Sequence, residues 1–249
     1  MRTRHVIEAK VEPVLMGWSS GKDSALALQA VLQDPSYRVE ALLTTVAEGT
    51  ERIEMHNVPL GLLERQAASI GLPLEVVCIP QQPPHEIYDE RMTDVLMRYR
   101  DRGVRRVVFG DVSLEGIREY RERKLSRVGM AGLFPLWRRD PRGLADAFIA
   151  RGFRAILTSV DPRRIAPAFC GRPFDVSLLN DLPAEADPCG EKGEFHTFVY
   201  DGPIFREPVG FVTRGVTERN GFWYCDILPT GQVETAGSDD VPRQSSRTI

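Results

Sequence analysis

The sequence of 249 residues has few cysteines and lysines, no long apolar run and no excess of positive charge. Its four cysteines lie 92, 19 and 36 residues apart, so no two have the C-x-x-C spacing of a zinc or redox site, and free thiols are expected. Cys78 lies in an apolar run and is predicted to be buried in the core. No apolar stretch approaches the roughly 20 residues that cross a bilayer, and the expected location is the cytoplasm.

The charge balance argues against a nucleic-acid-binding protein. The net charge is −3 and the isoelectric point is near 5.9, whereas nucleic-acid-binding domains usually have a basic excess. Basic residues do gather between Arg118 and Arg127, but glutamates are interleaved with them, which favours a solvated helix face. Only four residues are lysines, and two of them fall within the two motifs described below, which hints at a need for a compact ammonium there.

The first half of the chain alternates continuous apolar segments with amphipathic ones. Strands are predicted over residues 14–18, 39–46, 74–79 and 104–109, with helices after Ser24, over 59–70 and around 88–99. Continuous apolar strands separated by helices are typical of a parallel sheet that is covered on both faces. The pattern therefore predicts an α/β fold with a doubly wound, Rossmann-like parallel sheet, whose ligands bind beyond the carboxyl ends of the strands.

The second half has a different rhythm. Asp140 and Pro141 begin a predicted helix, and strand-like segments follow at 155–160, 195–200, 209–213 and 222–228. These short elements predict a second, smaller α+β domain. We place the first domain at residues 1–132, the second at 133–235, and a disordered polar tail at 236–249.

The loop Ser19-Ser20-Gly21-Lys22-Asp23-Ser24 is the strongest chemical signal in the sequence. A strand that feeds small residues into a helix N-terminus directs backbone N–H groups and the positive helix dipole at one point, which favours an anion. Lys22 adds a mobile cation, and Asp23 suits a phosphate-bound Mg²⁺. The loop is not a Walker A motif, because Met16 and Asp23 stand where that motif needs glycine and a hydroxyl residue. The alternative is a capped turn without a ligand.

A second segment concentrates ionisable side chains. Glu191, Glu194, His196 and Asp201 lie within eleven residues, between glycines that let the backbone approach a ligand. Glu194 and His196 are two residues apart and are predicted to share one face of a strand. Such a pair could bind a cationic substrate or hold a general base that deprotonates ammonium. From composition alone, a polar hairpin with a hydrogen-bonded histidine is equally consistent.

Both motifs resemble known proteins. Ser-x-Gly-x-Asp-Ser after the first strand is the pyrophosphate-loop pattern of the N-type ATP pyrophosphatases, the adenine nucleotide alpha hydrolase-like superfamily. That superfamily usually has glycine where Ser20 stands, and serine costs little there if the position keeps a negative φ. Gly190–Thr197, Asp201–Pro203, Phe109–Asp111 and Phe134–Trp137 resemble the diphthine–ammonia ligase family, and the match runs from about residue 13 to about residue 210. Family members often have asparagine where Lys192 stands.

The resemblance implies a PP-loop ATP-binding domain followed by a substrate-recognition domain. It implies an ATP-dependent ligase that adenylates a carboxylate, releases pyrophosphate and transfers ammonia, with ATP and Mg²⁺ as cofactors. The implied acceptor is a modified histidine on elongation factor 2, and a homodimer is a candidate assembly. The implied catalytic residues are Lys22, Asp23, Glu194 and His196, with Asp23 at the metal. Nucleotide binding is assigned to Ser19, Ser20, Gly21, Lys22, Asp23, Ser24, Thr44, Met55, His56, Gly110 and Asp111, and substrate binding to Glu115, Arg118, Glu191, Gly193, Glu194 and His196.

Three alternatives stay open at this point. A relative from an organism without diphthamide would amidate a different carboxylate. A nucleotide-binding sensor could keep the loop without ligase turnover. An RNA-modifying sulfurtransferase of the same superfamily is disfavoured by the acidic isoelectric point and the lack of paired cysteines. For single residues, His56 could be merely solvated, and Asp111 could cap the helix that is predicted to begin near Ser113.

Overall fold

The computed structural model describes residues 11–53, 55–81 and 85–231. Its larger sheet has five parallel strands in the order β3-β2-β1-β4-β5. The strands are β1 (Glu12–Gly17), β2 (Tyr37–Ala47), β3 (Leu74–Ile79), β4 (Arg106–Val108) and β5 (Ala131–Leu133). The predicted doubly wound parallel sheet is confirmed. Because the strand order reverses direction at β1, the crevice beyond the carboxyl ends of β1 and β4 is the expected ligand position.

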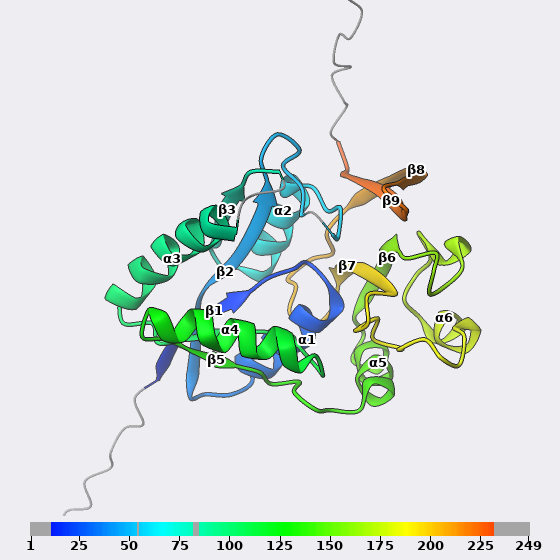
Figure 1. Cartoon of the computed structure of the whole chain (residues 1–249). Helices are drawn as coiled ribbons and strands as arrows, with labels where there is room; N and C mark the ends of the chain where they lie inside the picture. The colour runs from blue at the N-terminus through cyan, green and yellow to red at the C-terminus, as the bar shows by residue number, and fades with distance from the viewer. Residues whose placement is uncertain (1–10, 54, 82–84, 232–249) are drawn as a thin grey trace, which may run out of the picture.

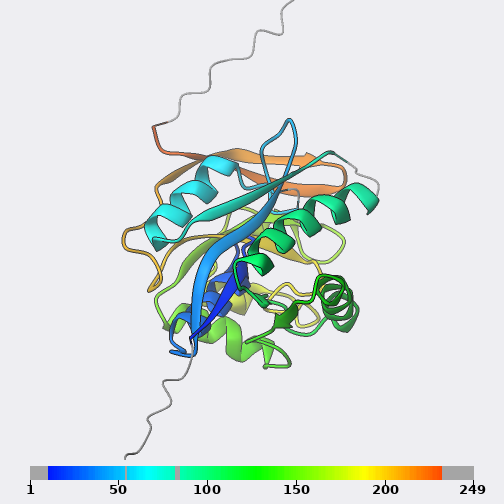
Figure 2. The same ribbon diagram turned by 90° about the vertical axis from the view of Figure 1, so that its left-hand side faces the viewer.

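Helices cover both faces of this sheet (Figures 1 and 2). They are α1 (Lys22–Leu32), α2 (Leu60–Ile70), α3 (His85–Asp101) and α4 (Glu115–Arg127). Strand side chains alternate between faces, so Val14 and Met16 pack in the core with α1 and α2, whereas Leu15 packs in the core with α3 and α4. Burial on both faces explains why the strands have continuous apolar runs rather than alternating ones.

The second half of the chain forms a four-stranded antiparallel sheet in the order β7-β6-β9-β8. Its elements are α5 (Pro141–Ala150), β6 (Arg154–Val160), the 3₁₀ helix η1 (Pro167–Phe169), α6 (Val176–Asp181), β7 (Phe195–Asp201), β8 (Phe211–Arg219) and β9 (Phe222–Pro229). Leu157, Phe198 and Ile227 from this sheet belong to the same buried cluster as Leu26 of α1 and Leu62 of α2. The two halves therefore share one core, and β7 lies next to α1 (Figure 1).

Some expectations differ from the structure. β5 and α6 were not predicted, because three- and six-residue elements are too short to show a period. Cys78 is exposed rather than buried, since β3 is an edge strand and Cys78 lies on its less covered side, between buried Val77 and Ile79. None of the described helices is long and apolar enough to cross a bilayer. The predicted tail at 236–249 lies outside the described residues.

Candidate functional site

A cleft of about 780 Å³ opens at the carboxyl ends of β1, β2 and β4 and is closed on its other side by the segment that leads into β7. Thirteen of the residues predicted for the site line it: Ser19, Gly21, Lys22, Asp23, Ser24, Thr44, Met55, His56, Gly110, Asp111, Glu191, Gly193 and His196. Both motifs, about 170 residues apart in the sequence, thus meet in one cleft. Ser20, Glu194, Glu115 and Arg118 do not line it.

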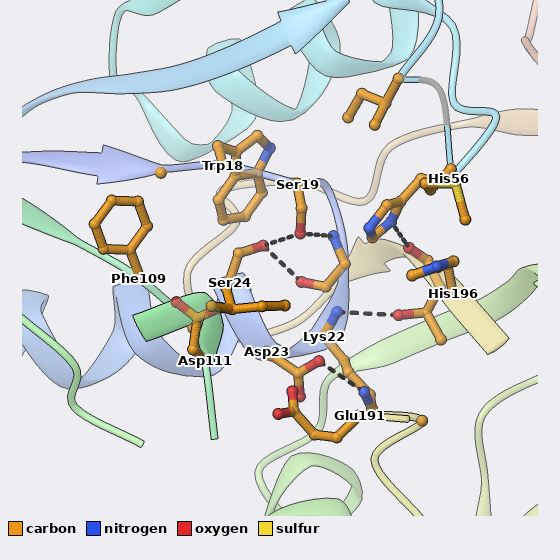
Figure 3. A pocket seen from close by; sticks show the side chains of 18 of the residues that line it. Trp18, Ser19, Lys22, Asp23, Ser24, His56, Phe109, Asp111, Glu191 and His196 are labelled. Atoms are coloured by element: carbon orange, nitrogen blue, oxygen red, sulfur yellow. Dashed lines mark hydrogen bonds and ion pairs between the residues drawn. The ribbon is translucent and has the colours of Figure 1, made fainter. Parts of the chain in front are cut away.

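The loop after β1 forms an open helix N-terminus. Gly21 is the N-cap of α1, and it provides no side-chain cap for the first N–H groups. The Ser19 hydroxyl donates to Ser24 Oγ at 3.2 Å, and the Ser24 hydroxyl donates to the Gly21 carbonyl at 2.8 Å (Figure 3). These bonds hold the loop in a tight curve. The positive end of the α1 dipole therefore faces the cleft, which favours a bound anion.

The Lys22 side chain is held in place by several contacts, whereas the sequence analysis expected a mobile cation. Its ammonium is buried, lies 2.8 Å from Asp23 Oδ2 and also donates to the Cys189 carbonyl. The rings of Phe174 and Phe195 lie 5.8 and 5.5 Å away, where they provide cation–π contacts. Burial alone lowers the pKa of Lys22, but the charge and hydrogen bond of Asp23, together with the nearby Cys189 and Glu191, outweigh it, and the pKa of Lys22 is raised. Lys22 therefore stays charged inside the protein.

Asp23 and Glu191 bring two carboxylates together from opposite halves of the chain (Figure 3). Burial and the charge of Asp23 raise the pKa of Glu191, and burial raises the pKa of Asp23. Asp23 Oδ1 is buried without a hydrogen-bond partner among the described residues. An unpartnered carboxylate oxygen beside a second carboxylate fits Mg²⁺, which binds one or two carboxylates together with substrate phosphates. The described residues contain no cluster of three or more metal-ligating side chains, so phosphates would have to complete the coordination.

Two histidines lie side by side on the opposite wall of the cleft. The rings of His56 and His196 have centroids 4.5 Å apart and are tilted by 35° (Figure 3). His56 Nδ1 lies 3.2 Å from the Thr197 carbonyl, which only accepts, so Nδ1 carries the proton and Nε2 has a free lone pair. Burial lowers the pKa of His56 to about 4, and burial together with His56 lowers the pKa of His196. Both rings are neutral at physiological pH and can accept protons or hydrogen bonds.

Gly110 sets the distance between β4 and α1. A Cβ atom at this position would lie 2.6 Å from the Asp23 carbonyl carbon and 2.8 Å from the Ser24 nitrogen, which no side chain tolerates. The next residue, Asp111, does not cap a helix. It forms an ion pair with Arg121 at 2.8 Å, and Leu114 is the N-cap of α4.

Ser20 lies behind the loop rather than in the cleft. The sequence analysis expected serine to cost little here if the residue had a negative φ. Its φ is 69°, so serine is strained at this position. The residue is fully buried, and its hydroxyl has no hydrogen-bond partner among the described residues. Its carbonyl accepts a hydrogen bond from the Val199 N–H at 2.9 Å. Ser20 thus connects the loop to β7 through its backbone.

Glu194 and His196 do not share a face. Glu194 precedes β7, is 1% exposed, and accepts hydrogen bonds from the backbone N–H groups of Asp187 and Lys192, both at 3.0 Å. The alternation of a strand does not extend into the preceding loop, so only His196 reaches the cleft. Glu194 shapes the loop that carries Glu191, and we do not retain it as a catalytic candidate.

Glu115 and Arg118 lie on α4, outside the cleft. Glu115 pairs with Arg138 at 2.8 Å, and Arg118 pairs with Glu122 at 2.9 Å. The Arg118 guanidinium also lies against the rings of Phe134 and Trp137, at 4.8 and 4.6 Å from their centroids. These contacts turn both side chains along the helix surface. The structure instead adds Thr197 to the cleft, a residue that its place directly after His196 in the motif could have indicated.

Comparison with known proteins adds three findings. The family models "Diphthamide synthase N-terminal domain" and "Diphthamide synthase C-terminal domain" match residues 12–132 and 140–228, together more than half of the chain. A diphthine–ammonia ligase from Schizosaccharomyces pombe is 28% identical over 108 residues, which cover 42% of this chain and 18% of that protein. The chain thus spans under a fifth of that relative. The U34-tRNA thiolase NcsA from Methanococcus maripaludis, solved with its [4Fe-4S] cluster, matches 56% of this chain and 57% of its own, with a TM-score of 0.36 and 15% identity.

Proposed function

The chain belongs to the diphthamide synthase family, and we propose from this that it is an ATP-dependent ligase that joins ammonia to a substrate carboxylate. The observation that carries the proposal is the N-terminus of α1, whose N-cap Gly21 has no side chain to cap it and which opens into a cleft beside an Asp23 oxygen that has no partner among the described residues. A polyphosphate with its metal matches both features. The similarity to a diphthine–ammonia ligase supports the same reaction class.

In this proposal the β- and γ-phosphates of ATP lie at the N-terminus of α1. The loop N–H groups that have no partner donate to the phosphate oxygens, and the buried Lys22 ammonium adds positive charge. Ser19 and Ser24 hold the loop in shape, because their hydroxyls donate to Ser24 Oγ and to the Gly21 carbonyl. Asp23 and Glu191 would hold Mg²⁺, which neutralises charge on the leaving pyrophosphate. Thr44, a buried threonine in the wall whose hydroxyl has no partner among the described residues, is available to the nucleoside.

The reaction has two steps. An oxygen of the substrate carboxylate attacks the α-phosphorus of ATP, the bond to pyrophosphate breaks, and an acyl-adenylate forms. Ammonia then attacks the acyl carbon, AMP leaves and an amide forms. The attacking nitrogen must lose a proton, and neutral His196, with His56 beside it, is the acceptor in the cleft. Preorganised donors around the phosphates supply most of the transition-state stabilisation.

The acceptor is assigned by family membership alone. We propose a carboxylate on a modified histidine of elongation factor 2, as the name of the similar ligase suggests, and a different carboxylate where diphthamide is not made. A homodimer remains a prediction. A nucleotide sensor is the second candidate, and the pinned Lys22 favours it, because an ammonium that already bonds Asp23 and Cys189 is less free to follow a reacting phosphate.

Product analysis tests this proposal. The protein is incubated with α-labelled ATP, Mg²⁺, ammonium and a cell extract as the source of the acceptor. AMP and pyrophosphate are the expected products, and Asp23→Asn should abolish them. Asp146→Asn, which changes an exposed aspartate of α5 that pairs with Arg142, is the matched control and should keep full activity. Formation of only ADP and phosphate rules out the mechanism, and tight ATP binding without turnover favours the sensor.

A further inference from the structure

Strand β7 of the second half supports the loop of the first half from behind. The Val199 N–H donates to the Ser20 carbonyl at 2.9 Å. The side-chain amide of Gln66 on α2 donates to both the Ser20 and the Val199 carbonyls, at 3.2 and 2.6 Å, and accepts from the Trp18 indole at 2.9 Å. Trp18 and Ser20 belong to the segment that links β1 to α1. The shape of this segment therefore depends on the second sheet.

Thr197 of β7 contacts the backbone at the start of α1. Its Oγ1 accepts a hydrogen bond from the Lys22 N–H at 3.1 Å, and its carbonyl accepts from His56 at 3.2 Å. It lines the cleft although it is only 2% exposed. A Cβ atom on Gly21 would lie 3.2 and 3.3 Å from the two Thr197 oxygens and 3.0 Å from the His56 ring. Thr197 and the glycine of the loop are thus packed directly against each other.

The Thr197 hydroxyl still has a proton that it can donate. The first N–H groups of a helix have no partner within the helix, and here Thr197 satisfies that of Lys22. A threonine hydroxyl that accepts a hydrogen bond still has its own proton to donate. Among the described residues no hydrogen bond uses that proton. The proton can therefore be donated to an acceptor in the cleft, beside the end of α1 where the helix dipole is positive.

We propose that Thr197 completes the pyrophosphate site: it holds the first turn of α1 through the Lys22 N–H and donates its hydroxyl to a phosphate oxygen of ATP. This inference rests on the proposed function, since it assigns a ligand group to the same cleft. The site for the leaving group is then built by both halves of the chain. One threonine couples it to the histidine pair, because the Thr197 carbonyl also orients His56.

The role proposed for Thr197 predicts different effects on the binding of ATP and of AMP. Thr197 lies at the end of α1 that receives the β- and γ-phosphates, which AMP lacks. Loss of its hydroxyl should therefore weaken the binding of ATP and of free pyrophosphate and leave AMP binding unchanged. A residue that served only the packing of β7 would instead affect all three ligands to the same degree, through the stability of the fold.

The test uses Thr197→Val, which keeps the side-chain volume, and Thr197→Ser, which keeps the hydroxyl. Binding of ATP, pyrophosphate and AMP is measured by isothermal titration calorimetry with Mg²⁺, and melting temperatures are recorded. Hydrogen bonds to charged groups predict a roughly 10- to 100-fold loss of ATP and pyrophosphate affinity for Thr197→Val, with AMP affinity within twofold of wild type. Thr197→Ser should stay close to wild type.

Two further variants complete the design. Thr213→Val makes the same change at an exposed threonine of strand β8, outside the cleft, and should bind all three ligands normally. Thr197→Cys keeps a weak donor of similar size and replaces Thr197→Val in the test if the valine variant does not fold. It should show a smaller loss of ATP and pyrophosphate affinity. Unchanged ATP affinity in the valine and cysteine variants, or an equal loss for AMP, overturns the role of Thr197. A wild-type protein that binds neither ATP nor pyrophosphate overturns the proposed function itself.

Discussion

Replacing Ser20 with glycine should stabilise the protein, although the change lies in the middle of the candidate phosphate loop. Ser20 has a φ of 69°, in the left-handed region where residues with a Cβ are strained. It is fully buried, and its hydroxyl has no partner among the described residues. Its backbone carbonyl provides the contacts with Val199 and Gln66, and glycine keeps that carbonyl.

Three terms set the size of the effect. Left-handed strain costs about 1–2 kcal/mol for a residue with a Cβ. The added flexibility of glycine in the unfolded chain removes about 0.5–1 kcal/mol of that gain. A buried hydroxyl without a partner costs about 1 kcal/mol or more, and both alanine and glycine relieve this cost. Ser20→Gly should therefore add about 2 kcal/mol to the free energy of unfolding, and Ser20→Ala about 1 kcal/mol.

Thermal and urea unfolding measure this directly. For a chain of this size 1 kcal/mol corresponds to about 2–4 °C in melting temperature, so Ser20→Gly should melt about 4–8 °C above wild type. Ser24→Gly, within α1, is the control of opposite sign: it loses two hydrogen bonds and a helical residue and should melt lower. A Ser20→Gly protein that melts at or below the wild-type temperature, or no higher than Ser20→Ala, refutes the assignment of strain.

Three other perturbations test the site. Gly110→Ala places a Cβ against the backbone of α1 and should cost about 3 kcal/mol of stability or displace the helix, with loss of ATP binding; calorimetry and titration detect either result. The pKa of His56 is lowered to about 4 in the folded protein, so the unfolded state takes up a proton first as the pH falls. The free energy of unfolding should therefore decrease between pH 6.5 and 4, by up to about 1.4 kcal/mol per pH unit. His56→Gln should flatten that part of the curve, and an unchanged slope in urea titrations contradicts the assignment. Glu191→Ala should weaken Mg²⁺-dependent ATP binding more than Glu191→Gln, which can still accept from the N–H groups of Val112 and Ser113, and equal losses would mean that only the charge matters.

Local patterns in the sequence were sufficient for the main elements of the first half and for the helix that opens the second. The α/β rhythm, the left-handed Gly71 that ends α2 and the Asp140 cap of α5 follow from hydrophobic period and cap chemistry, which act over a few residues. The sequence analysis missed one signal. Asn220-Gly221 between two strand-like segments predicts a tight hairpin. This turn connects β8 to β9, and β8 is therefore longer than predicted.

The chemical groups of the candidate site could be identified from the amino-acid order alone, because the small and charged residues of the loop and of the second motif are adjacent in the chain. Which of these groups come together depends on the folded chain. Folding turned Glu194 toward backbone N–H groups, pinned Lys22 on Asp23 and Cys189, and placed Thr197 on the end of α1. Ser20 shows the reason. Whether serine fits there depends on φ, and φ is fixed by contacts with a strand about 180 residues further along the chain, which no local pattern contains.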